Sequence, residues 1–146
     1  GELIQHTVPS SFEQSKIDLA YSNQIYNLVN EFRLLNNVPK LLISPLLNEV
    51  AMEHSEYMVL KDLNINAEAE IIPIESRLEE KNMTYKKVDV NSAIHYYDAI
   101  EAVHGWINSK EHRDILFNKR YNMSGTGVYL NKYIQVYIEK ETSIDY

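Results

Sequence analysis

The sequence predicts an α+β domain in which amphipathic helices pack against a small antiparallel sheet. Two patterns favour this fold class. Apolar residues recur at the three- and four-residue spacing of helices in several segments. Two alternating segments near the end of the chain are typical of a β-hairpin. Helices interleaved with such a sheet form a layered domain around a core.

The composition is typical of a globular protein with one domain. The 146 residues suffice for one sizeable core. A net charge of −7 makes nucleic acid and an anionic membrane surface unfavourable partners, because both repel an acidic protein. No stretch approaches the roughly 18 apolar residues that a membrane-spanning helix needs. The absence of cysteine excludes disulfides and thiol chemistry, and it does not fix the compartment.

The first half of the chain is predicted to contain three helices. Residues 1–18 are expected to form an arm or the remnant of a linker, and the domain is expected to span residues 19–146. An apolar stripe that begins after Ser22 and ends before Pro39 predicts the first helix. Ser44 and Pro45 predict the start of the second, since they suit its N-cap and first helical position. A short third helix is expected at 73–81.

The second half is predicted to contain three strands and a fourth helix. A strand is expected at 85–91, and further strands at about 125–131 and 133–140, with a turn at Asn131-Lys132. Asp98 and Glu101 have the spacing of a capping box, which predicts the start of the fourth helix. Trp106 ends the apolar stripe of that helix, so we expect it to be buried against the sheet.

The alternation from Tyr133 to Tyr137 predicts which side chains share a face of the last strand. Tyr133, Gln135 and Tyr137 should point to one face, and Ile134 and Val136 to the other. Helices should cover both faces, so most of these tyrosines are interpreted as core packing. His54, on the apolar side of the second helix, is interpreted as a core histidine bonded to the backbone.

Three motifs in the last third of the chain carry a family resemblance. Residues 106–116 read W-I-N-S-K-E-H-R-D-I-L, residues 125–128 read G-T-G-V, and residues 133–135 read Y-I-Q. They resemble the CAP superfamily (cysteine-rich secretory, antigen-5 and pathogenesis-related proteins) in its bacterial, cysteine-free form. The resemblance covers about 19–140. It implies a helix–sheet–helix sandwich around a small, mainly antiparallel sheet of three or four strands.

The resemblance also implies where a functional cleft should lie. CAP domains similar to this chain carry two His and two Glu in a cleft, a set that can bind Zn²⁺ or serve acid–base chemistry. The matching positions in this sequence hold other residues: Asn66 or Ala67, Val90, Ser109 and Lys132. His112, from the Ser-x-x-His-Arg motif, is then left without an assigned partner ligand, whereas a catalytic zinc site usually has three protein ligands. We therefore expect a degenerate site with no metal and no cofactor.

The residues expected to line this cleft come from several motifs. They are Val90, Asn91, Asn108, Ser109, His112, Tyr133 and Gln135. His112, Asn91 and Ser109 should meet in space. Val90 and Asn91 alternate along a strand, so only one of them can face the cleft. If the family's direction is kept, Val90 points in.

The leading functional hypothesis is a non-catalytic CAP/SCP-like binding module, extracellular or displayed at the surface of a bacterium. Its ligand would be a protein, a cell-wall fragment or a lipid. Because the chain begins at Gly1 without a methionine, we expect that a signal or anchor has been removed. The alternative is a peptidase-like hydrolase that uses His112 as its catalytic residue. A third hypothesis is a sensory or interaction domain whose partner precedes Gly1.

Overall fold

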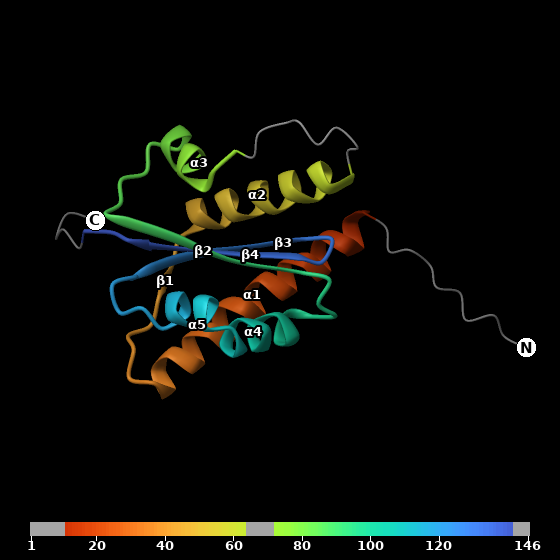
Figure 1. Cartoon of the computed structure of the whole chain (residues 1–146). Helices are drawn as coiled ribbons and strands as arrows, with labels where there is room; N and C mark the ends of the chain where they lie inside the picture. The colour runs from red at the N-terminus through yellow and green to blue at the C-terminus, as the bar shows by residue number, and fades with distance from the viewer. Residues whose placement is uncertain (1–10, 64–71, 142–146) are drawn as a thin grey trace, which may run out of the picture.

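The computed structural model describes residues 11–63 and 72–141, which form a three-layer sandwich (Figure 1). Helices α2 and α3 cover one face of the sheet, and helices α1, α4 and α5 cover the other. The elements are α1 (Ser11–Leu35), β1 (Leu42–Ile43), α2 (Pro45–Leu63), α3 (Ile74–Glu80), β2 (Lys87–Ile94), α4 (Ala99–Asn108), α5 (Lys110–Leu116), β3 (Met123–Tyr129) and β4 (Lys132–Glu139).

The sheet has four strands in the order β1-β3-β4-β2. The short β1 runs parallel to β3, and the other neighbours are antiparallel. The α+β class and the mainly antiparallel sheet between helical layers are thus confirmed. Among the described helices, none has the length and apolar character to cross a membrane.

The start of α1 is a correction to the sequence analysis. The helix begins at Ser11 instead of Ser22, so residues 11–18, which were assigned to an arm, are helical. Residues 1–10 lie outside the described part. The inward positions of this early segment carry polar side chains, which interrupts the apolar stripe. Asp18 is buried, accepts a hydrogen bond from Gln14 and bonds the backbone of Leu130 in the β3–β4 turn.

Local capping signals marked the starts of α2 and α4 correctly. The Ser44 hydroxyl accepts a hydrogen bond from the Leu47 amide at 3.1 Å, and α2 begins at Pro45. The Asp98 carboxylate accepts from the Glu101 amide at 2.9 Å. The Glu101 carboxylate, in turn, accepts from the Tyr97 amide rather than that of Asp98, a variant of the expected capping box.

The turn between β3 and β4 lies one residue earlier than predicted, at Leu130-Asn131. Tyr129 pairs with Lys132, so the loop has two residues. Both have positive φ, 44° and 64°, as in the type I′ turns that match strand twist. An Asn favours this conformation, whereas a Leu gives no such signal in the sequence.

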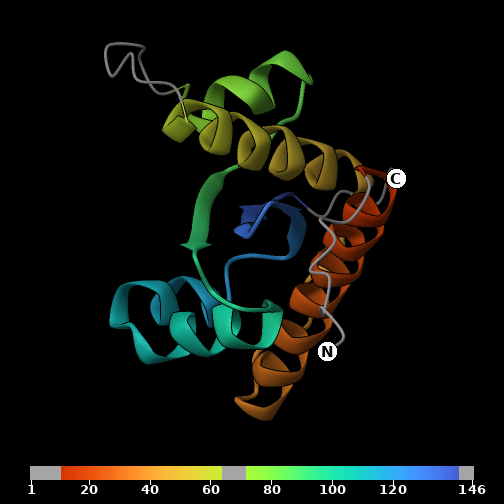
Figure 2. The same ribbon diagram turned by 90° about the vertical axis from the view of Figure 1, so that its right-hand side faces the viewer.

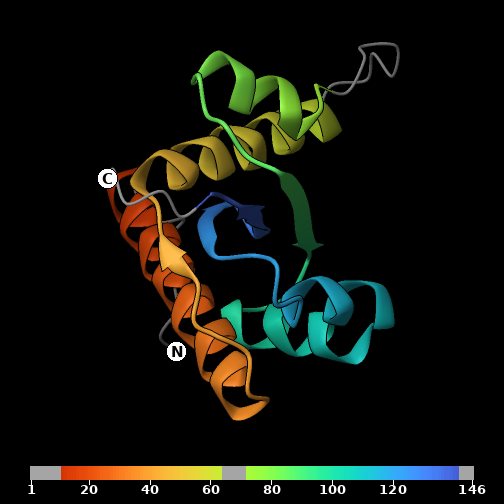
Figure 3. The same cartoon turned by 90° about the vertical axis from the view of Figure 1, so that its left-hand side faces the viewer.

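Helix α2 approaches the backbone of β3 closely, and two glycines permit this contact. A Cβ at Gly125 would lie 2.1 Å from the carbonyl carbon of Leu47. One at Gly127 would lie 2.3 Å from the amide nitrogen of Met52. The G-T-G-V motif is therefore explained by layer packing. Figure 3 shows α2 lying over the sheet, with α4 and α5 on its other side.

Arg33 is fully buried at the end of α1 and donates four hydrogen bonds to main-chain carbonyls. Its Nε bonds Pro39 at 2.9 Å and its Nη2 bonds Tyr121 at 3.0 Å. Its Nη1 bonds Leu116 at 2.7 Å and Asn118 at 3.1 Å. Within the described residues no carboxylate forms an ion pair with it. The guanidinium thus joins α1 to the loops that precede β1 and β3.

Replacing this guanidinium should destabilise the fold strongly. In Arg33→Met the four carbonyls lose their donor, and those of Leu116 and Tyr121 are in buried bonds, so we expect roughly 3–5 kcal/mol less unfolding free energy in a urea titration. Arg120→Met is the matched control, since Arg120 is exposed and pairs with Glu139 at the surface. The unfolding free energy of that control should fall by no more than about 1 kcal/mol. Equal losses in the two variants would contradict the clamping role of Arg33.

Trp106 lies where α4 meets the sheet, as predicted. It is 1% exposed, and its Nε1 donates to the carbonyl of Ser92 on β2 at 3.0 Å. It belongs to the core between the sheet and helices α1, α4 and α5. A separate core lies between the sheet and α2–α3.

Truncating the indole should remove a large share of the domain's stability. We expect Trp106→Ala to lower the unfolding free energy by about 3–5 kcal/mol, because it leaves a cavity and an unpaired carbonyl. Tyr97→Ala, at a side chain that is 82% exposed, is the control and should change it little. A negligible shift of the denaturant midpoint in Trp106→Ala would show that this packing does not support the fold.

Candidate functional site

The motif residues come together where β2 meets the junction of α4 and α5. Ser109 follows α4 directly and is the N-cap residue of α5, with extended backbone angles. This single-residue break turns the chain, so the half-buried His112 stands in the first turn of α5. The Asn-Ser break seen in the sequence is therefore a helix-to-helix corner.

Asn91, Ser109 and His112 converge, which confirms the predicted geometry. The Asn91 amide donates to the carbonyl of His112 at 3.0 Å and to the Tyr137 hydroxyl at 3.3 Å. The His112 Nδ1 and the Ser109 hydroxyl oxygen are 3.0 Å apart. Asn91 thus holds the main chain of α5 against the sheet, and Ser109 orients the imidazole. Their role in binding a ligand stays a prediction.

The direction of Val90 is a correction. Asn91 is completely buried on the α5 side of β2, and Val90 packs against the core under α2 and α3. Successive strand residues point to opposite faces, so the bond between Asn91 and His112 turns Val90 away from His112. Val90 therefore does not form the floor of a pocket beside His112.

Tyr133 and Gln135 lie below the surface rather than at a cleft wall. Both are fully buried. Gln135 donates to the Ser124 hydroxyl at 3.0 Å and accepts a hydrogen bond from the Tyr137 hydroxyl. The Tyr133 hydroxyl donates to the carbonyl of Tyr96 at 3.2 Å. Burial raises the pKa of Tyr133 to about 12 and raises that of Tyr137 as well, so both hydroxyls stay protonated.

The predicted division of β4 between the two faces is confirmed. Tyr133 and Tyr137 belong to the core beneath α1 and α4, while Ile134 and Val136 belong to the core beneath α2. The tyrosines thus serve packing, as expected, and each hydroxyl finds a hydrogen-bond partner.

A cavity of about 460 Å³ opens along the outer side of α4, and we call it the α4 cavity. Asn108 and Ser109 line it, together with Tyr96, Glu101, His104 and Gly105. The amide of Asn108 lies 3.2 Å from His104 Nδ1. A Cβ at Gly105 would lie 2.4 Å from the Tyr96 hydroxyl, so the glycine lets this ring rest against the helix. Of the predicted cleft residues, this surface therefore gathers Asn108 and Ser109.

Glu101 and His104 were not among the residues expected to line the cleft. A signal was present, because residues 101, 104 and 108 follow the three- and four-residue spacing that places side chains on one helix face. The apolar residues of the same helix occupy the opposite face, and their periodicity predicts packing alone.

Within residues 11–63 and 72–141, no group of three or more His, Asp or Glu side chains is placed to hold a metal ion. The positions Asn66 and Ala67, named for a missing histidine, lie outside the described residues. His112 has Ser109 as its side-chain partner, and no carboxylate of the described residues bonds it. The expectation of a site without metal therefore stays a prediction.

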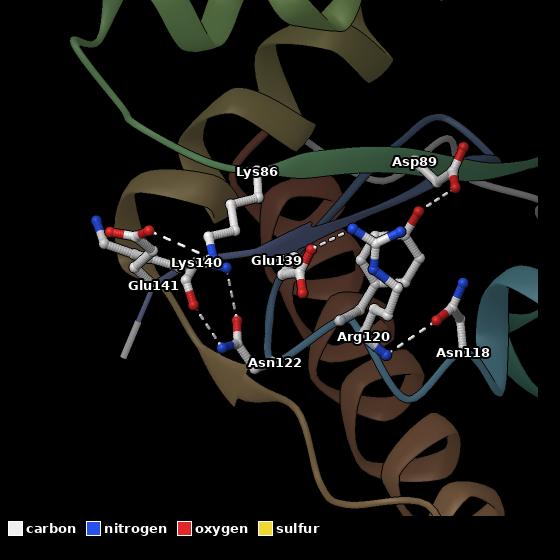
Figure 4. A network of polar contacts seen from close by, with 9 residues as sticks. Lys86, Asp89, Asn118, Arg120, Asn122, Glu139, Lys140 and Glu141 are labelled. Carbon is white, nitrogen blue, oxygen red and sulfur yellow. Dashed lines mark hydrogen bonds and ion pairs between the residues drawn. The ribbon is translucent and has the colours of Figure 1, made fainter. Parts of the chain in front are cut away.

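A second polar cluster closes the far end of the sheet (Figure 4). The Tyr121 hydroxyl donates to the Asp89 carboxylate, and Arg120 pairs with Glu139 at 2.8 Å. Lys86 forms an ion pair with Glu141. The side chain of Asn122 forms two hydrogen bonds with the main chain of Lys140. These pairs tie the ends of β2 and β4 to the loop before β3, which is a structural role.

Comparison with known proteins identifies the same family and the same fold. The model of the cysteine-rich secretory protein family, CAP, matches residues 26–138. "Uncharacterized membrane protein YlbC" of Bacillus subtilis strain 168 is 33% identical over 140 residues, which cover 96% of this chain and 40% of that protein.

Solved structures with this fold come from several bacteria. An extracellular protein containing an SCP domain from Bacillus anthracis is 27% identical with a TM-score of 0.84, covering 92% of this chain and 45% of that one. A cysteine-rich secretory protein from Staphylococcus aureus is 25% identical with a TM-score of 0.72, covering 84% and 40%. An outer surface protein from Borrelia burgdorferi, 18% identical with a TM-score of 0.66, covers 82% and 92% and shares the fold.

The chain spans less than half the length of the B. subtilis relative and of the B. anthracis and S. aureus structures. Because the family model matches most of the chain, the resemblance seen in the three motifs is confirmed, and the chain belongs to the CAP family of cysteine-rich secretory proteins.

Proposed function

We propose that this CAP domain is a non-catalytic binding module. The observation that carries the proposal is that the motif side chains form hydrogen bonds within the fold. Asn91 bonds the main chain of His112, Ser109 bonds its imidazole, and Trp106 bonds the backbone of β2. These bonds hold the α4–α5 corner in place instead of presenting a reactive set, and they leave one buried acceptor, Asn91 Oδ1, without a partner among the described residues.

The α4 cavity is the surface that would receive the ligand. Glu101, His104 and Asn108 offer hydrogen-bonding groups there, and Tyr96 offers an aromatic ring. A protein, a cell-wall fragment or a lipid could be the ligand of such a module. The hydrogen-bonding groups in this lining support a protein or a cell-wall fragment over a lipid, because a lipid would cover them without pairing them.

We further propose that the domain acts outside the bacterial cell. The B. anthracis protein of the same fold is described as extracellular and the B. burgdorferi protein as an outer surface protein, while the B. subtilis relative is called a membrane protein. In the bacterium that carries this domain, trypsin added to intact cells should degrade it. Protection until the cells are lysed would contradict a surface location.

A hydrolase remains the second candidate because one contact favours it. The Ser109 hydroxyl and His112 Nδ1 are 3.0 Å apart, which is within the reach of a nucleophile and its base. A base of this kind is usually oriented by a third group. No described carboxylate bonds His112. The same contact is explained by the N-cap position of Ser109, so the binding role is better supported.

Zinc titration tests whether the motif residues form a metal site. We expect no stoichiometric binding in isothermal calorimetry, because the described residues offer too few ligands and the sequence has no histidine at 63–69. His112→Ala should give the same baseline as the unmodified domain. One-to-one binding in the micromolar range that is lost in His112→Ala would overturn the prediction.

A cell-wall assay separates binding from hydrolysis. Incubated with purified Gram-positive cell walls, the domain should sediment with them and release no soluble fragments detectable by mass spectrometry. Asn108→Ala should reduce the bound fraction several-fold, because it removes a donor from the α4 cavity. Lys110→Ala, an exposed change two residues away, is the matched control. Fragments that disappear with both Ser109→Ala and His112→Ala would establish the hydrolase instead.

A further inference from the structure

An exposed aromatic loop joins β2 to α4. It comprises His95, Tyr96 and Tyr97, and all three residues are exposed. His95 has a φ of 65°, in the left-handed region that is uncommon for residues other than glycine. The chain therefore bends where β2 ends, and the two tyrosines stand directly before α4.

Three contacts hold this loop in place. The buried Tyr133 donates from its hydroxyl to the carbonyl of Tyr96 at 3.2 Å. The Tyr97 amide donates to the Glu101 carboxylate at 2.9 Å. The Tyr96 ring rests against Gly105, where a Cβ would lie 2.4 Å from the ring's hydroxyl oxygen. The loop is thus ordered before any ligand arrives, which lowers the entropy cost of binding.

From this fixed loop the Tyr97 ring extends into solvent. It is 82% exposed, and no described ring or cation packs against it. Tyr57 is the contrasting case, because Arg77 lies 5.0 Å from the centre of its ring. Arg77 also donates to His54 Nδ1 at 3.2 Å, in place of the backbone bond expected for this histidine. A tyrosine offers a large, rigid contact area at low entropy cost, so the uncovered Tyr97 suits a binding surface.

Three polar side chains continue this surface along α4. Glu101, His104 and Asn108 are exposed and share one helix face, over about 10 Å of the helix axis. Glu101 bonds Tyr97 through Oε2, and Asn108 contacts His104 through its amide nitrogen. Among the described residues, Glu101 Oε1 and the Asn108 amide oxygen have no partner. A row of mixed donors and acceptors matches hydroxyl groups, which both donate and accept.

The charge of this surface favours an uncharged ligand. Of the described residues that line the α4 cavity, none is a Lys or an Arg, and Glu101 is a carboxylate. Asp98 adds a second carboxylate at the start of the helix, in a chain whose net charge is −7. An anionic ligand would therefore be repelled. A cationic ligand would gain little, because ion pairs with exposed carboxylates are weak.

We propose that Tyr97 and the α4 cavity form a binding site for an uncharged oligosaccharide. The Tyr97 ring stacks on one sugar ring, because the negative face of an aromatic ring attracts the C–H groups of the sugar. Glu101, His104 and Asn108 bond the sugar hydroxyls. The inference rests on the proposed function, since it names the ligand class of the α4 cavity as the glycan part of a cell-wall fragment.

Titration with a soluble oligomer of N-acetylglucosamine, followed by NMR, tests the site. We expect saturable shifts of the main-chain amides between 96 and 109. Tyr97→Ala should weaken binding at least about tenfold, whereas Tyr97→Phe keeps the ring and should bind as the unmodified domain does. Leu42→Ala is the matched control and should also bind normally, because Leu42 is 56% exposed on β1, at the other edge of the sheet from β2. No saturable shifts, shifts confined to other segments, or equal binding by Tyr97→Ala would overturn the site.

Sedimentation with purified Gram-positive cell walls separates this inference from the proposed function. The free oligomer should release the domain from the walls. The bound fraction should be equal at low and high salt, because an uncharged glycan offers no attraction for salt to screen. Wall binding that is lost at high salt, or that a synthetic stem peptide reduces and the oligomer does not, would overturn the glycan assignment and leave the binding module standing. Failure to bind either the walls or the oligomer would contradict both proposals.

Discussion

The buried guanidinium of Arg33 is the interaction on which the layered arrangement depends. Its four hydrogen bonds reach carbonyls at Pro39 and at three positions between 116 and 121. Those two segments lead into β1 and β3, the parallel pair of the sheet. Irregular backbone cannot satisfy its own carbonyls, so a rigid planar donor fixes both loops at once. The carbonyl dipoles, in place of a carboxylate, stabilise the charge.

The residues of the family motifs stabilise the fold, whether or not a ligand is bound. Asn91, Tyr137, Gln135 and Ser124 form a chain of buried hydrogen bonds across β2, β4 and β3. A slip of one residue in the register would bury these groups without partners, which costs about 1–3 kcal/mol each. The glycines of β3 admit α2 by direct contact. A match to these motifs therefore predicts the sandwich reliably, and it carries little information about chemistry.

The features that the sequence predicts depend on residues close together in the chain, and the features that it does not predict depend on residues far apart. The starts of α2 and α4 depend on neighbours three residues apart, so Ser44 and Asp98 marked them. The inward direction of Asn91 depends on a bond to His112, 21 residues away, and alternation alone offers two equal choices. The Arg33 contacts span 83 to 88 residues on the α5 side. A lone arginine in an apolar stripe gives no local sign of such partners.

The residues at the family's cleft positions lie in two different layers of this chain. Val90 and Lys132 both face the α2 layer, whereas Ser109 belongs to the α4–α5 corner, and β2 runs between the two layers (Figure 2). Where the resemblance places carboxylates and imidazoles, the chain thus has an apolar side chain, a hydroxyl and an ammonium. Because Ser109 lies on the other side of the sheet from Val90 and Lys132, these three side chains do not form one site. The packing of this chain therefore divides the family's cluster between two layers, and a ligand in the α4 cavity would meet Ser109 alone of the three.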